Sequence, residues 1–314
     1  MSHVFKKTGN AFILEERTEI HNELPSAVYK VNSVPNIGIV FQPLNITKDD
    51  LIKVENSTTT EVVNFINNFK SEDTKVRYKQ TKVVHKTGIL LHGVPGSGKS
   101  STINLVIDEL LKDNAIVFFD AAPDLVSAVL PAVREQNPNK LICVVYEEFE
   151  EWLKHDAAVI NSFLDGQLSV NNMIVLATTN YISKIPSRIK NRPSRFQLVK
   201  EVGVPTANFR QAWFTQKLTD IGHPDKIAEF TDQSEGMVTD QMKDMIVSNI
   251  ALQIPLPEVV SKLQEMSSEA IGLDDYVEHE QYRELTSNDL RKMFALPKGL
   301  QLKPNKGPSD PWKS

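Results

Sequence analysis

Short apolar runs alternate with longer segments of helical periodicity through the middle of the chain. The runs are bounded by polar or turn-forming residues and are largely apolar throughout, which is typical of strands buried on both faces of a sheet. The segments between them repeat apolar residues every three or four positions, as amphipathic helices do. The expected strands are residues 88–92, 115–119, 141–146, 173–178 and 195–199, and the expected helices are 101–112, 124–135 and 155–168. This alternation over residues 81–203 predicts an α/β fold with a parallel sheet and helices on both faces.

The flanking segments predict smaller units. Residues 1–80 hold two strand-like runs, 27–31 and 37–41, and an amphipathic helix over 57–69, which together predict a small N-terminal α+β extension. Residues 204–302 show helical periodicity, and residues 303–314 read as a disordered tail. The helices expected in the C-terminal part are 207–219, 225–230, 239–254 and an acidic stretch within 256–290.

Composition narrows the class of protein. The 314 residues are 40% hydrophobic and 24% charged, which suits a globular protein with a sizeable core. The net charge of −5 gives no general support to nucleic-acid binding, although it does not exclude a local basic patch that binds nucleic acid. Cys143 is the single cysteine, which excludes an intramolecular disulfide. No apolar run reaches the length of a membrane span and the N-terminus lacks an apolar signal core, so a cytoplasmic protein is expected.

The most specific motif follows the first strand of the alternating region. Residues 93–100 read G-x-x-x-x-G-K-S, the pattern of a phosphate-binding loop, and the next residues begin a helix. Glycines let backbone N–H groups point at an anion, and the helix N-terminus adds its positive dipole end. Lys99 would reach the β- and γ-phosphates of ATP, and the Ser100 hydroxyl would ligate Mg²⁺. The residues expected to hold the nucleotide are Gly93, Pro95, Gly96, Ser97, Gly98, Lys99, Ser100 and Ser101.

A second motif lies at the end of the strand predicted over 141–146. That strand is followed by Glu147 and Glu148, and its tip should lie beside the phosphate-binding loop at the carboxyl edge of the sheet. We expect Glu147 to hold Mg²⁺ and Glu148 to act as the general base that polarises the attacking water. The reverse register, with Tyr146 and Glu147 as the pair, would put an aromatic ring at the metal position.

Two further polar positions fit the same chemistry. Asn180 ends the next strand, where its amide would lie near the γ-phosphate. Arg192 and Arg195 follow at the outer edge of the domain, where they could reach the nucleotide of a neighbouring subunit as arginine fingers.

In this order, the motifs resemble those of the AAA+ ATPases, and specifically of the AAA clade. The resemblance covers about residues 57–255, and the lead-in over 87–93 is most similar to the branch that holds the mitochondrial Rieske-protein translocase. It implies Glu148 as catalytic base, Asn180 as the sensor-1 residue, and Arg192 and Arg195 as fingers acting in trans. It also implies ATP and Mg²⁺ as ligands, a homo-oligomeric ring, most simply a hexamer, and a C-terminal helical lid that begins over 236–240 and moves with nucleotide state.

Three departures from this pattern bear on function. Glu147 stands where the clade has aspartate, and its extra methylene changes the reach to the metal. The resemblance favours this register over the one with Tyr146 at the metal position, because Phe149 then falls where the family has its apolar residue. Residues 118–124 lack the aromatic pore loop of polypeptide-threading unfoldases, and no membrane span like that of the similar branch is present. Tyr78 or Lys79 is a candidate for a stacking or cation–π contact with adenine.

These features support three hypotheses about the function of the protein. The first is an ATP-driven motor that remodels a protein or macromolecular assembly. The second is a nucleic-acid-associated AAA+ factor, such as a helicase loader, clamp-loader-like protein or packaging accessory, which the basic residues between Lys184 and Arg195 favour. The third is a nucleotide switch with little turnover, which Glu147 suggests.

Overall fold

The computed structural model describes residues 3–8, 11–16, 22–46, 57–165 and 171–266. Contacts between Cα atoms divide the chain into two units, residues 1–253 and residues 254–314. In the second unit, residues 256–266 form a helix. The acidic stretch and tail predicted beyond residue 266 lie outside the described residues.

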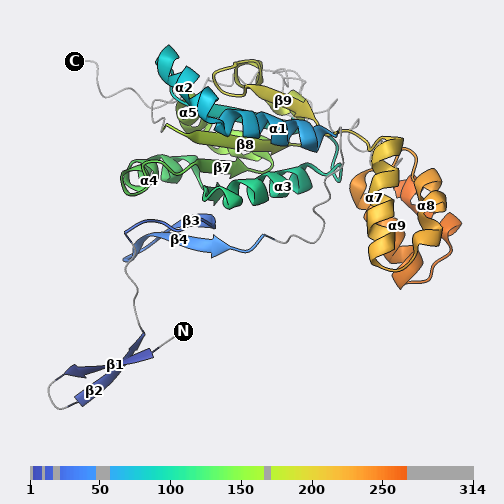
Figure 1. Ribbon diagram of the computed structural model, residues 1–314, viewed down its shortest axis with the longest axis horizontal. Coiled ribbons are helices and arrows are strands. Elements are labelled where there is room, and N and C mark those ends of the chain that lie inside the picture. The colour runs from blue at the N-terminus through green and yellow to red at the C-terminus, as the bar shows by residue number, and fades with distance from the viewer. Residues whose placement is uncertain (1–2, 9–10, 17–21, 47–56, 166–170, 267–314) are drawn as a thin grey trace, which may run out of the picture. The chain divides into compact units, whose positions relative to one another are not determined.

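The first unit contains a seven-stranded sheet with the strand order β4-β3-β6-β7-β8-β5-β9 (Figure 1). All neighbours are parallel except β3 and β4, which form an antiparallel hairpin at one edge. The strands are β3 (Val28–Val34), β4 (Gly38–Leu44), β5 (Lys86–His92), β6 (Ile116–Phe119), β7 (Ile142–Tyr146), β8 (Met173–Thr179) and β9 (Leu198–Glu201). The predicted α/β fold with a mostly parallel sheet is confirmed.

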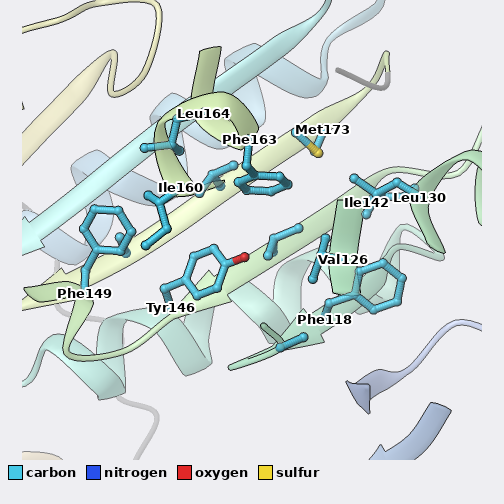
Figure 2. Packing of buried hydrophobic residues seen from close by; sticks show 14 of the residues in the cluster. Phe118, Val126, Leu130, Ile142, Tyr146, Phe149, Ile160, Phe163, Leu164 and Met173 are labelled. Atoms are coloured by element: carbon cyan, nitrogen blue, oxygen red, sulfur yellow. The ribbon is translucent and has the colours of Figure 1, made fainter. Parts of the chain in front are cut away.

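The central strands are apolar throughout because both faces of the sheet are covered. One face packs against α1 (Thr58–Lys70) and α3 (Lys99–Lys112), and the other packs against α4 (Pro123–Gln136) and α5 (Phe149–Asp165). Alternate residues of each strand enter opposite cores, as the two-residue period of a strand requires. Figure 2 shows the core on the second of these faces, where the rings of Phe118, Tyr146, Phe149 and Phe163 pack between the sheet and helices α4 and α5.

The strands predicted in the N-terminal extension join the main sheet. Val28 of β3 pairs in parallel with Val117 of β6, and the β3–β4 hairpin thereby covers the β6 edge. A separate antiparallel pair is formed by β1 (His3–Thr8) and β2 (Ala11–Glu16). Helix α2 (Glu72–Thr81) was not expected from the sequence, because it has no buried residue and therefore no apolar stripe.

The helical part of the first unit follows β9. Its elements are α7 (Ala207–Asp220), a 3₁₀ turn (Pro224–Lys226), α8 (Ile227–Gln233), α9 (Thr239–Ile246) and a π-helical turn (Val247–Ala251). Phe214 and Phe230 pack edge to face across α7 and α8, with ring centroids 5.5 Å apart. The helix predicted over 239–254 is thus two shorter elements. The remaining elements are a 3₁₀ turn (Ile182–Lys184) and α6 (Ser187–Lys190).

Several element boundaries differ from those predicted, and the largest shift is at the start of α5. Helix α5 begins at Phe149 rather than residue 155, because the buried Phe149 ring packs against Phe196 directly after the acidic pair. Strand β9 begins at Leu198 rather than residue 195. Among the described residues, no helix is long and apolar enough to cross a bilayer.

Strand β5 depends on a glycine at its centre. A Cβ atom added at Gly88 would lie 1.9 Å from the Arg195 carbonyl oxygen, and the Gln197 N–H donates to the Gly88 carbonyl at 2.9 Å. The segment that leads into β9 therefore passes too close to β5 for any side chain.

We predict that Gly88→Ala lowers the free energy of unfolding by about 3 kcal/mol, since the obstructing atom is backbone and cannot swing aside. The matched control is Gly203→Ala, because no heavy atom lies within 4 Å of the added Cβ there. The control should change stability by at most about 0.5 kcal/mol. Urea unfolding followed by circular dichroism measures both, and equal stabilities of the two variants would contradict the close approach.

Candidate nucleotide-binding site

The phosphate-binding loop connects β5 to α3, as predicted. Gly96 and Gly98 adopt positive φ angles of 74° and 102°, which favour glycine. A Cβ at Gly96 would lie 3.2 Å from side-chain atoms of Asp240 and Val238, so it would crowd both residues as well as strain the backbone. The loop thus forms a cradle of backbone at the N-terminus of a 14-residue helix, the geometry that suits a phosphate.

Lys99 begins α3 and is held inside this loop. Its side chain is 8% exposed, and Nζ donates to the carbonyl oxygens of Gly93 at 2.8 Å and Val94 at 2.9 Å. Burial lowers the pKa of Lys99, whereas the nearby carboxylates, Glu150 first among them, act in the opposite direction. The ammonium group therefore lies at the loop that the sequence assigned to phosphate.

The two residues predicted to hold the metal ion, Ser100 and Glu147, are in contact. The Ser100 hydroxyl donates to Glu147 Oε1, although the two residues are 47 positions apart in the chain. Of the two registers considered for the acidic pair, this contact supports the one with Glu147 at the metal position. Tyr146 instead is 1% exposed and packs in the core against Phe149 and Trp152.

A cavity of about 630 Å³ brings the predicted site together. It is lined by Pro95, Gly96, Gly98, Lys99, Ser100, Ser101, Asn104, Asp120, Glu147, Glu148, Thr178, Asn180, Asp240 and Lys243. Predicted phosphate, metal, base and sensor residues from β5, β7 and β8 all reach the same space. Asp240 comes from α9, whose start was predicted as that of the lid, and its N–H donates to the Gly96 carbonyl at 3.1 Å.

A second cavity of about 290 Å³ adjoins the first and shares Gly98 and Ser101 with it. Its walls include apolar side chains from α7 and the segment before it, among them Val204, Phe209 and Trp213. Ser97 also lines it, and the Ser97 hydroxyl is buried with no hydrogen-bond partner in the described part of the protein.

The residues present fit a nucleotide with its metal ion. The first cavity offers a backbone cradle, a lysine, a hydroxyl and carboxylates, which are the groups that bind a triphosphate and Mg²⁺. The second cavity offers apolar walls and the unpartnered Ser97 hydroxyl for the remainder of the ligand.

Tyr78 and Lys79, the candidates for a contact with adenine, line neither of these two cavities. The Tyr78 ring packs against Phe69 and His85, with ring centroids 6.1 and 4.8 Å away. The resemblance to related ATPases placed this residue where the chain passes the adenine, but the ring packs against Phe69 and His85 instead.

The two candidate finger residues differ in their surroundings. Arg195 is 5% exposed, and its guanidinium forms a two-pronged contact with Asp165, with both N···O distances 2.7 Å. It also donates to Asn161 Oδ1 and, at 3.2 Å, to the Arg188 carbonyl oxygen. Arg192 contacts Asp165 at 3.2 Å, but its side chain is 55% exposed. This placement argues against a finger role for Arg195 and leaves Arg192 at the surface.

Sequence reasoning missed Asp120 at the end of β6. Its Oδ1 accepts the Glu147 N–H at 2.9 Å, and it lines the larger cavity. Burial, together with the carboxylates of Glu147 and Glu148, raises the pKa of Asp120 to about 6, while the bond from the Glu147 amide opposes this shift. The signal available in the sequence was an acid directly after a predicted strand, which is the position that Glu147 occupies after its own strand.

Comparison with known proteins agrees with this geometry. Residues 89–204 match the family described as ATPase family associated with various cellular activities (AAA). A protein of Plasmodium falciparum (isolate 3D7), provisionally named as a cell division cycle ATPase, is 26% identical over 137 residues. Those residues are 38% of this chain and 11% of that protein, so the chain matches a small part of this longer relative.

Asp120 should make stability depend on pH. Its folded pKa of about 6 lies above its ordinary value of 3.8, so the unfolded chain loses this proton first as pH rises. The free energy of unfolding should therefore fall between pH 4 and pH 7 through this group. Asp120→Asn keeps an acceptor for the Glu147 amide and removes the titration.

We expect the fall in stability from pH 4 to pH 7 to be smaller in Asp120→Asn than in the parent, as measured by urea unfolding without nucleotide. An identical pH dependence in the two proteins would show that Asp120 titrates at the usual pH of an exposed carboxyl.

Proposed function

Because residues 89–204 carry an ATPase domain of the AAA type, we propose that this protein is a Mg²⁺-dependent ATPase that works as a homo-oligomeric ring, most simply a hexamer. We further propose that it remodels a protein or macromolecular assembly. The observation that carries the proposal is the single cavity lined by Lys99, Ser100, Glu147, Glu148 and Asn180, which derive from three different strand ends.

Each of these residues has a role that its position supports. Lys99 binds the β- and γ-phosphates, and Ser100 with Glu147 holds the metal ion. Glu148 orients a water and accepts its proton, and Asn180 hydrogen-bonds to the attacked phosphate group. Bound Mg²⁺ supplies positive charge at the phosphate oxygens. The longer reach of Glu147, relative to the clade's aspartate, is matched here by its contact with the Ser100 hydroxyl.

Arg192 is the residue we assign to the neighbouring subunit's site. Its exposed guanidinium can leave Asp165 without uncovering a buried charge, whereas Arg195 cannot. We assign Arg195 to holding the loop in place through Asp165. An arginine in trans stabilises the charge of the transition state, and activity then requires assembly.

The basic residues that favoured nucleic acid are largely engaged within the chain. Lys184 Nζ lies 3.5 Å from the centre of the Tyr181 ring, Lys190 Nζ donates to the Ile182 carbonyl at 2.8 Å, and Arg195 is buried. With a net charge of −5, the chain offers more support for a protein substrate than for DNA or RNA.

The first test is the steady-state ATPase rate as a function of protein concentration, with and without single- and double-stranded DNA. The proposal expects a specific rate that rises with concentration and is unaffected by DNA. Stimulation by DNA that fades as salt increases would instead favour the nucleic-acid-associated reading. Tight ATP binding with almost no turnover at any concentration would favour a switch.

A mixing experiment tests the arginine assignment. Glu148→Gln and Arg192→Ala should each be nearly inactive alone. Mixed, they should regain activity, because an Arg192→Ala subunit keeps its base and receives Arg192 from a Glu148→Gln neighbour. Arg192→Ala should change the free energy of unfolding by at most about 0.5 kcal/mol.

Arg195→Ala serves as the contrast, since it removes a buried partner of Asp165 and should lower the melting temperature clearly. Full activity of Arg192→Ala alone, or no recovery on mixing, would contradict the assignment of Arg192.

A further inference from the structure

Two backbone amides at the site are held by side chains of the opposite strand end. The Glu148 N–H, just after β7, donates to Thr178 Oγ1 of β8 at 3.3 Å. The Asn180 N–H, just after β8, donates to Oε1 of Glu150 in the first turn of α5, also at 3.3 Å. Each strand end thus supplies the acceptor for the other. We call this pair of bonds the strand-end clamp.

The two acceptor residues of the strand-end clamp are buried. Thr178 and Glu150 are each 4% exposed, so water does not readily replace either acceptor. An N–H group left without a partner in such surroundings is destabilising. The negative charge of Glu150 also lies at the N-terminal end of α5, where the helix dipole favours it.

Glu148 adopts a conformation that needs support. Its φ angle is 47°, in the left-handed region that residues with a side chain rarely occupy. Such a conformation persists only when its surroundings hold it. Here the Glu148 N–H is bound to Thr178, and its carbonyl oxygen accepts the Glu151 N–H at 2.8 Å. The turn that aims the Glu148 carboxylate is therefore tied on both sides.

We propose that Thr178 and Glu150 are positioning residues, which fix the general base Glu148 and the sensor Asn180 relative to each other. This inference rests on the proposed ATPase function and adds to it. Water activation requires the base and the phosphate-binding amide to approach the same phosphorus from set directions, and an error of about 1 Å can lower a rate about 100-fold. The clamp fixes the backbone from which each of the two side chains extends, so both groups start from set positions.

Glu150 has one oxygen in the clamp and one outside it. Its Oε2 is buried and has no hydrogen-bond partner in the described part of the protein. One acceptor oxygen is therefore enough for the role proposed here, and glutamine at this position should preserve it. Methionine has a similar length and no oxygen, so Glu150→Met removes the bond with little change in volume.

The experiment compares variants that break and keep the clamp. Thr178→Val and Glu150→Met should lower kcat about 10- to 100-fold, with the Kd for ATP changed less than about threefold. Thr178→Ser and Glu150→Gln should restore most of kcat. A purely structural role would instead lower stability and nucleotide affinity together, and the conservative variants would not separate kcat from Kd.

Thr179→Val is the matched control. Thr179 is the next residue of β8, is fully buried, and accepts the Tyr181 N–H at 3.0 Å, so it holds an amide beyond the two catalytic groups. Its kcat should remain within about threefold of the parent value. A loss equal to that of Thr178→Val, or unchanged kcat in both clamp-breaking variants, would overturn the proposal.

Hydrogen exchange gives a readout that does not require hydrolysis. Breaking either bond should speed amide exchange in peptides that cover both strand ends. Thr179→Val frees only the Tyr181 amide, so it should leave exchange in the peptide that covers Glu148 unchanged. If the parent protein fails to hydrolyse ATP, the proposed function fails while exchange still tests the clamp. If ATP is hydrolysed and exchange is unchanged in Thr178→Val and Glu150→Met, the clamp alone is refuted.

Discussion

The site depends on how a parallel sheet ends. At its carboxyl edge, β5, β6, β7 and β8 stop beside one another, and the N–H groups that follow the last ladder bonds need other acceptors. This chain supplies side chains for that purpose, with Asp120 accepting from Glu147, Thr178 from Glu148, and Glu150 from Asn180. The same residues that complete the backbone hydrogen bonding therefore fix the direction of the groups expected to perform chemistry.

The charges around the cavity set a second condition. Four acids line it, Asp120, Glu147, Glu148 and Asp240, against two lysines, Lys99 and Lys243. A triphosphate would bring further negative charge into this space, so we expect its binding to require a divalent cation that balances the carboxylates. Burial raises the pKa of Asp120, and the neighbouring carboxylates of Glu147 and Glu148 add to this rise.

Features encoded within a short window of sequence were predictable. About ten residues of sequence are enough to recognise the phosphate-binding loop, a buried strand or the acidic pair, because glycine positions and apolar runs have local causes. The roles of residues that contact distant segments of the chain could not be predicted from such short windows. Nothing near Arg195 in the sequence indicated its burial against Asp165, and nothing near Glu150 distinguished it from the exposed acids around it. Helix α2 lacks an apolar stripe, and the β3–β4 hairpin gives no local sign that it extends the main sheet.

The close approach at Gly88 has a mechanical consequence. Strand β9 is fastened to β5 at both ends, by the Gln197 N–H to the Gly88 carbonyl and by the Val202 N–H to the His92 carbonyl at 2.7 Å. The loop that carries Arg192 precedes β9, and the phosphate-binding loop follows β5, so the two loops belong to opposite ends of one hydrogen-bonded strand pair. Because the two strands are hydrogen-bonded along their paired length, they resist sliding past each other. In the ring proposed above, a small displacement of the phosphate-binding loop in one subunit would therefore be passed along this strand pair to the loop of Arg192, which we assigned to the neighbouring subunit's site.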